Sequence, residues 1–187
     1  MNRKQQKEQT REHLLATAYK EFAKNGFLAT KTLDVAQSAG VSHGALFVHF
    51  PTREELLATV VDKLGLQMGE KLQQLSKENA SPKEILFVHL SVIKEFEPLY
   101  TRLVMEGPLL PPSVRNRILF IQAGIAHHLE KALSKKKPSS PIHLLLNSWL
   151  GLIHYYLSNK DLFAPKKSVI DTHGKELLEH FIKTHKL

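Results

Sequence analysis

The chain has 187 residues, of which 42% are hydrophobic, and it contains no cysteine. This composition favours a packed, helix-rich protein over a disordered one. It also excludes a disulfide framework, a thiolate metal site and a cysteine nucleophile. The net charge of +8 is uneven, because the first 53 residues hold eight Lys and Arg against four Asp and Glu. This gradient suits a polyanionic partner for that part of the chain, although a basic, solvated surface would give the same count.

Two stretches bear on location. The first residues, MNRKQQKEQTREH, lack an apolar run and are not expected to be a signal peptide. The longest apolar stretch, Ile142–Leu157, is interrupted by polar residues and is too short to span a bilayer. We therefore expect a cytoplasmic protein with no membrane partner.

The first predicted helix follows a polar N-terminal segment. Thr10 is the expected N-cap, and residues 2–9 are expected to be frayed ahead of it. The helix should end at Gly26, because glycine accepts the positive φ that a helix end often requires. Its predicted core residues recur at helical spacing: Leu14, Leu15, Ala18, Tyr19 and Phe22.

Residues 32–56 predict two short helices joined by a glycine turn, followed by the start of a third helix. Gly40 ends the first short helix, and Ser42 is a strong N-cap for the second. Pro51 stops the second, and Thr52 with Glu55 forms a capping box that opens the third. This arrangement is a helix-turn-helix, which places its second helix in the major groove of DNA.

The rest of the sequence predicts six longer helices and no strand, so the fold class is all-α with about nine helices. Pro98 is expected to break one of these helices, and the segment 107–112 is expected to be a loop. The first three expected helices run from 53 to about 78, from 82 to about 96, and, as a short continuation, up to 106. The other three run from 113 to the basic run at 135–137, from 142 to about 157, and from 168 to 185.

One spacing pattern is specific enough to suggest a family. It reads Ala36-x-x-Ala39-Gly40-Val41-Ser42-x-Gly44-x-x-Phe47-x-His49-Phe50-x-x-Arg53-x-x-Leu56. The pattern resembles the DNA-binding signature of the TetR family of bacterial transcription regulators. The resemblance implies a DNA-binding domain over residues 1–52 and a ligand-binding and dimerisation domain over residues 53–187. It also implies a homodimer formed through the last two helices. Their apolar surface exceeds what one bundle readily covers, which favours the same assembly.

The resemblance also implies which residues contact double-stranded DNA. Ser42 would meet a phosphate, His43 and Ala45 would read base edges, and Gly44 would allow close approach. Phe47 replaces a tyrosine that usually reaches a phosphate, so Phe47 either belongs to the core or touches a thymine methyl group. The remaining expected backbone contacts are Lys31, Thr32, His49 and Arg53. For each polar residue the alternative is a solvated surface side chain.

A small-molecule effector is the second partner that the resemblance implies. The predicted helix over 142–157 carries one polar stripe formed by His143, Asn147, Gly151, His154 and Ser158. This stripe either faces a ligand cavity or is the solvent side of the helix. The expected pocket residues are Phe96, Tyr100, Met105, Phe120, His143, Asn147, Trp149 and His154.

No cofactor, metal site or enzymatic activity is expected. No two of the eleven histidines are three or four residues apart, which is the spacing that lets one helix offer two imidazoles to one ion. No nucleophile elbow or glycine-rich phosphate loop is present. The resemblance therefore implies a homodimeric repressor that a small molecule releases from a palindromic operator. The alternatives are a constitutive DNA-binding dimer and a ligand-binding protein that has lost DNA binding.

Overall fold

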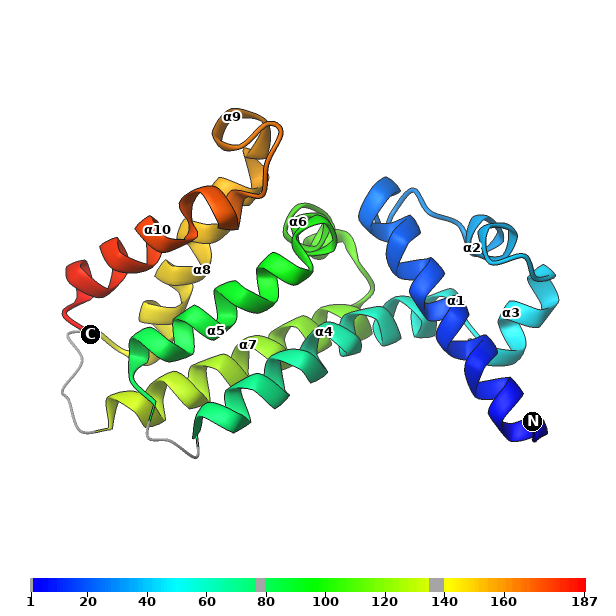
Figure 1. The fold of residues 1–187 in the computed structure, drawn as a ribbon, viewed down its shortest axis with the longest axis horizontal. Coiled ribbons are helices and arrows are strands. Elements are labelled where there is room, and N and C mark those ends of the chain that lie inside the picture. Colours follow the sequence, from blue (N-terminus) through cyan, green and yellow to red (C-terminus); the bar gives the residue numbers. More distant parts are fainter. Residues whose placement is uncertain (1, 77–79, 135–139) are drawn as a thin grey trace. The chain divides into compact units, whose positions relative to one another are not determined.

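The computed structural model describes residues 2–76, 80–134 and 140–187, and over these residues it contains helices and no strand. Figure 1 shows the helices in chain order. None of the helices in the described part of the chain has the length and hydropathy needed to cross a bilayer. The elements are α1 (Arg3–Asn25), α2 (Thr32–Ser38), α3 (His43–His49), α4 (Arg53–Ser76), α5 (Pro82–Glu95), α6 (Glu97–Glu106), the 3₁₀ helix η1 (Gly107–Leu109), α7 (Pro112–Leu133), α8 (Ile142–Ser158), α9 (Lys160–Phe163) and α10 (Val169–His185).

The all-α fold class is confirmed, and most helix ends lie where local capping signals predicted them. The Ser42 side chain accepts a hydrogen bond from the Ala45 backbone at 3.2 Å, and the Thr52 hydroxyl accepts one from the Glu55 backbone at 3.0 Å. Ser81 and Glu84 form a capping box at the start of α5, and Ser168 caps α10. Gly26 and Gly40 have φ of 90° and 68°, which lie in the region that side chains disfavour.

Three expectations about helix boundaries were wrong: the start of α1, the loop over 107–112 and the absence of α9. α1 begins at Arg3, because Asn2 caps it in a box with Gln5, and the Thr10 hydroxyl instead donates to the Gln6 carbonyl within the helix. The break expected near Pro98 is confirmed, because α5 ends at Glu95 and Pro98 lies in the first turn of α6, where proline is tolerated. Part of the expected loop 107–112 is the 3₁₀ helix, and the single-turn α9 was missed. The predicted ends near 78 and the basic run 135–137 lie outside the described residues.

The chain divides into two compact units. One comprises Met1–Lys63 and Pro98–Arg117, and the other comprises Leu64–Glu97 and Ile118–Leu187. The polypeptide therefore passes between the units within α4, before Pro98 and within α7. The functional division at residues 52 and 53 stays a prediction.

The N-terminal unit includes α6 because side chains of α6 bind the end of α1 and the turn that follows. Glu106 accepts a hydrogen bond from the Leu28 backbone at 2.8 Å. Arg102 donates to the Lys24 carbonyl at 2.9 Å. In the same unit, the buried rings of Phe22 and Phe27 stack with their centroids 5.1 Å apart. The turn before α2 is thus held by packing from α1 and by polar contacts from α6.

The core of the C-terminal unit forms where α10 packs against α5 and α8. Trp149 is fully buried, and its ring lies 5.0 Å from that of Phe181. Leu178 and Phe181 are each only 3% exposed in a single chain. The expectation that the main apolar residues of the last helix await a second subunit is therefore wrong, because α5 and α8 of the same chain already cover them.

A buried carboxylate on α6, that of Glu97, binds the start of α10 within the C-terminal unit. Glu97 is 3% exposed and accepts hydrogen bonds from the backbone of Val169 at 2.9 Å and of Ile170 at 3.1 Å. Ser168 and Lys160 donate to the same carboxylate at 2.5 and 3.0 Å. Burial by itself raises the pKa of Glu97, but these four hydrogen bonds outweigh burial and hold the pKa below its ordinary value. The carboxylate is therefore ionised and fixes the start of α10.

Candidate nucleic-acid interface

The helix-turn-helix is built by short-range contacts. The Lys31 backbone donates to the Asp34 carboxylate at 2.9 Å, which places an acidic group in the first turn of α2. The Val41 backbone donates to the Ala36 carbonyl at 3.0 Å across the turn at Gly40. Ser42 then starts α3. The turn and the cap set the direction of α3 relative to α2.

Side chains of α1 contact the turn between α2 and α3. His13 Nε2 lies 3.1 Å from the Ala39 carbonyl, and the Ser38 hydroxyl donates to Glu21 at 2.8 Å. Arg11 lies over the ring of Phe50 with its Cζ 4.9 Å from the centroid, a cation–π contact. The Arg11 side chain is thus engaged in a contact within the protein.

The two faces of α3 differ sharply. Leu46, within α3, and Phe50, its C-cap, are fully buried. The opposite face is exposed and consists of two pairs of residues, the members of each pair being one helical turn apart. They are His43, Gly44, Phe47 and Val48, which we call the α3 outer face.

The structure positions His43 through a neighbour on α2. His43 Nε2 lies 2.9 Å from the Thr32 hydroxyl, and its ring centroid is 4.9 Å from that of Phe47. Thr32 and His43 were predicted separately, as a backbone contact and a base reader, and the structure brings them together. Thr32 therefore orients the imidazole on the α3 outer face.

The other predicted residues of this region have different surroundings. Phe47 is 37% exposed and so does not belong to the core. Lys31 is exposed, and Ala45 is half-buried. His49 is half-buried, and its Nδ1 is buried without a hydrogen-bond partner among the described residues.

Arg53 makes contacts that the sequence did not predict. Its guanidinium donates to the carbonyls of Phe27 and Thr30, in the turn between α1 and α2. A fork of planar donors suits two neighbouring carbonyl oxygens. Substituting Arg53 would therefore also loosen this turn, so the substitution does not isolate a phosphate contact.

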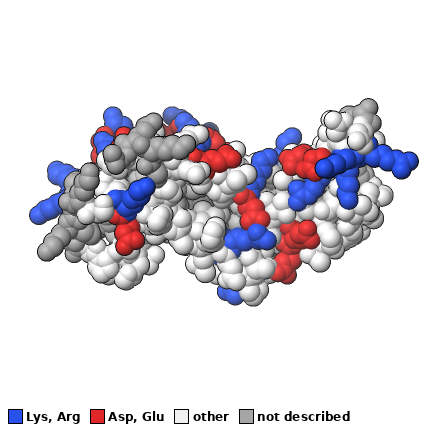
Figure 2. Space-filling model, turned by 90° about the horizontal axis from the view of Figure 1, so that it is seen from below, with Lys and Arg blue, Asp and Glu red and all other residues white. Residues whose placement is uncertain are grey.

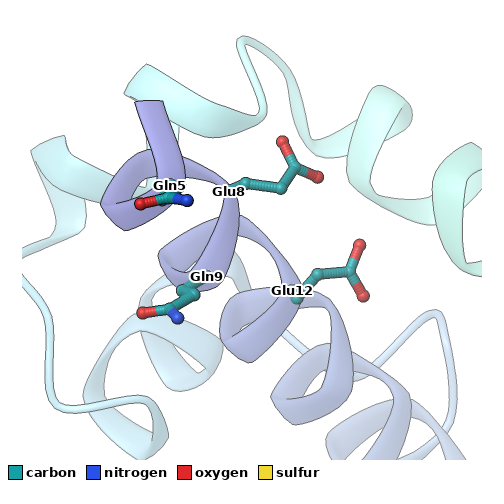
Figure 3. A pocket seen from close by; sticks show the side chains of 4 residues that line it. All are labelled: Gln5, Glu8, Gln9 and Glu12. Atoms are coloured by element: carbon teal, nitrogen blue, oxygen red, sulfur yellow. The ribbon is translucent and has the colours of Figure 1, made fainter. Parts of the chain in front are cut away.

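On the right of Figure 2, Lys and Arg side chains lie close together on the N-terminal helices, with acidic side chains beside them. A hollow on α1 is lined instead by Gln5, Glu8, Gln9 and Glu12. In Figure 3 the carboxylates of Glu8 and Glu12 point to the same side of the helix. Two carboxylates repel phosphate, so this hollow does not suit a nucleic-acid backbone.

The expected effector residues are spread over both units. Tyr100 and Met105 belong to the N-terminal unit, and the others belong to the C-terminal unit. His143 and Asn147 are exposed, as are Met105 at 55% and Phe120 at 81%. Within the C-terminal unit, Phe96 and Trp149 are buried and His154 is partly buried.

A buried polar group near Trp149 was not among the predicted site residues. The Trp149 indole donates to His89 Nδ1 at 2.9 Å, and His89 is 1% exposed. Burial, followed by the charge of His154, lowers the pKa of His89 to about 3. Burial lowers the pKa of His154 to about 4. The signal in the sequence was a histidine inside the apolar stripe of α5. Among the described residues, no group of three or more His, Asp and Glu is placed to hold a metal ion.

Comparisons with known proteins agree with this geometry. Residues 14–60 match the family model for bacterial regulatory proteins of the tetR family. A stretch of 79 residues is 34% identical to YerO of Bacillus subtilis, an uncharacterised HTH-type transcriptional regulator. That stretch spans 41% of this chain and only 27% of the length of YerO.

Two solved structures share the fold of nearly the whole chain. NalD of Pseudomonas aeruginosa, the secondary repressor of the MexAB-OprM multidrug efflux pump, has a TM-score of 0.72 at 20% identity, covering 95% of this chain and 96% of its own. FadR of Bacillus subtilis, solved with stearoyl-CoA, has a TM-score of 0.71 at 19% identity, covering 91% and 97%. The signature at the helix-turn-helix and the family match agree, so residues 14–60 belong to the tetR family of bacterial regulatory proteins, and nearly the whole chain shares the all-helical fold of these two structures.

Proposed function

We propose that the protein is a DNA-binding transcriptional regulator in which α3 enters the major groove. The observation that carries the proposal is the α3 outer face, which a capped and braced helix presents to solvent. Side chains at the start of such a helix reach base edges. The residues proposed to contact DNA are Lys31, Thr32, Ser42, His43, Gly44, Ala45, Phe47, His49 and Arg53.

We propose that the regulator acts as a homodimer formed through α8 and α10, with residues 53–187 serving dimerisation and effector binding. Because Leu178 and Phe181 are already buried, the exposed side of α8 supports this proposal. Leu144 is 51% exposed, and Gly151 and Tyr155 on the same helix are also exposed. A two-fold dimer presents one α3 to each half of a two-fold site, so the operator should be palindromic.

Selection from random DNA duplexes is expected to recover an inverted repeat with half-sites about 34–36 Å, or one turn of DNA, apart or at a multiple of this distance. His43→Ala should change the preferred base at one or two positions in each half-site, at a cost of roughly 1–3 kcal/mol there. The measurement is binding of every single-base variant of the selected site at one salt concentration.

Leu144→Glu separates assembly from DNA contact. A half-exposed side chain tolerates a charge in the isolated chain, so this variant should fold and bind a single half-site as the wild type does. It should bind the full inverted repeat more weakly, because two charges would meet at the subunit interface. Selection of an asymmetric, single-copy motif would contradict the dimer.

We also propose that the protein is a repressor that a small-molecule effector releases from DNA. NalD is described as a repressor, and FadR was solved with an acyl-CoA, which supports these roles for a protein of the same fold. Within the C-terminal unit, the residues proposed to bind the effector are Phe96, Phe120, His143, Asn147, Trp149 and His154.

Effector release requires reciprocal affinities. A compound that weakens operator binding must bind the operator complex more weakly by the same factor, typically 1–3 kcal/mol of coupling. Calorimetry of a compound found by screening, with free and with operator-bound protein, measures both affinities. Equal affinities for every compound that binds would favour a constitutive DNA-binding dimer. Absence of sequence-specific DNA binding, with retained ligand binding, would favour the ligand-binding alternative.

A further inference from the structure

The α3 outer face offers mostly apolar surface to its partner. Val48 is 66% exposed and Phe47 is 37% exposed, and the two are adjacent on α3. Gly44 lies one turn before Val48 and contributes no side chain, and a Cβ placed there would meet nothing within 4 Å. The face is therefore open around its two apolar side chains.

Few hydrogen-bonding groups on this face are available for base edges. The Ser42 hydroxyl accepts from the Ala45 backbone as the helix cap. His43 Nε2 pairs with the Thr32 hydroxyl, which leaves Nδ1 as its second polar atom. On the α3 outer face, His43 is the residue whose side chain carries hydrogen-bonding atoms, and the remaining contact area belongs to Phe47 and Val48.

An apolar surface in the major groove has one apolar feature to recognise on the edges of the standard bases, the C5 methyl group of thymine. Cytosine presents an amino donor, and guanine and adenine present polar atoms at their groove edges. We infer that Phe47 and Val48 are specificity-determining residues that read thymine methyl groups in each half-site. This inference rests on the proposed function as an operator-binding protein.

The test replaces each thymine of the selected operator by deoxyuridine, one position at a time. This change removes only the methyl group and keeps base pairing. Loss of one buried methyl is expected to weaken binding about fourfold, which corresponds to about 0.8 kcal/mol. The same change in both half-sites should weaken binding by more than tenfold. Affinity is measured at constant salt, because phosphate contacts make it salt-dependent.

Variants of the protein assign the methyl contact to its residue. Val48→Ala is the main variant, because an exposed side chain can be shortened without disturbing the core. At the thymine that Val48 reads, the deoxyuridine penalty should disappear in Val48→Ala, and Phe47→Ala should do the same at a second position. Leu162→Ala, at a 73% exposed position on α9, is the matched control and should keep every penalty.

Three results would overturn the inference. The first is a specific operator whose affinity is unchanged by deoxyuridine at every half-site thymine, or that contains no thymine. The second is a methyl penalty of wild-type size in both α3 variants. The third is an altered assembly mass for Val48→Ala with unchanged operator affinity, which would assign the face to a protein partner. Absence of any preferred duplex would instead overturn the proposed function and this inference together.

Discussion

Glu97→Ala is expected to lower the free energy of unfolding of the C-terminal unit by about 3–5 kcal/mol. The substitution removes the acceptor for two buried backbone N–H groups, those of Val169 and Ile170. Each buried donor left without a partner costs about 1–3 kcal/mol. Lys160 also loses its partner, at 3.0 Å in the intact protein. Trp149 is the single tryptophan of the chain and lies in this unit, so its fluorescence during urea unfolding reports the loss.

Two variants make this experiment specific. Glu95→Ala removes the carboxylate that pairs with Lys71 at the protein surface, and it should cost less than about 1 kcal/mol. Glu97→Gln keeps the shape and one acceptor oxygen and should fall between the wild type and Glu97→Ala. Equal costs for Glu95→Ala and Glu97→Ala would show that the buried carboxylate does not hold α10.

The helix ends show how far local sequence signals reach. Ser42 and Thr52 were predicted as caps, and each accepts a hydrogen bond from a backbone group three residues away. Glu97 also caps a helix, but it lies 72 residues from Val169 in the chain. Its sequence neighbours carry no information about that contact, so only the tertiary structure reveals it.

The candidate interface shows the same limit. The spacing around Gly40 correctly predicted where α2 and α3 lie in the chain. It did not predict that Thr32 orients His43, or that Arg53 binds carbonyl groups of the turn between α1 and α2. These contacts join residues 11 and 26 positions apart, and they depend on how the helices pack.

Burial was the least predictable property of the effector residues. Helical spacing placed Trp149 on the apolar side of α8, where the structure buries it, and placed His143 and Asn147 on the exposed stripe. Periodicity could not show that Phe120 stays exposed, because a single aromatic residue fits either side of a long amphipathic helix. It also could not show that His89 meets Trp149, which is 60 residues away.

Acid is expected to destabilise the C-terminal unit well above the pH at which carboxylates titrate. The folded protein holds the pKa of His89 at about 3 and that of His154 at about 4, whereas an unfolded histidine has a pKa of about 6.5. Below pH 6.5 the unfolded chain therefore takes up protons that the folded chain excludes. Stability is complete above pH 6.5 and is lost progressively as the pH falls toward 4 and 3. At pH 5 the expected loss is about 2 kcal/mol for each histidine.

Urea unfolding at pH 7.5 and pH 5, followed by Trp149 fluorescence, measures this loss, and His89→Asn assigns it. Asparagine offers an oxygen in place of Nδ1, so the indole N–H keeps an acceptor while the titrating group is removed. The variant should lose about 2 kcal/mol less than the wild type between the two pH values. His127→Asn changes an exposed histidine on α7 and should leave the acid sensitivity unaltered. If His89→Asn and His154→Asn both retain the full sensitivity of the wild type, other groups must take up the protons. His89 and His154 would then bind protons equally well in the folded and in the unfolded chain.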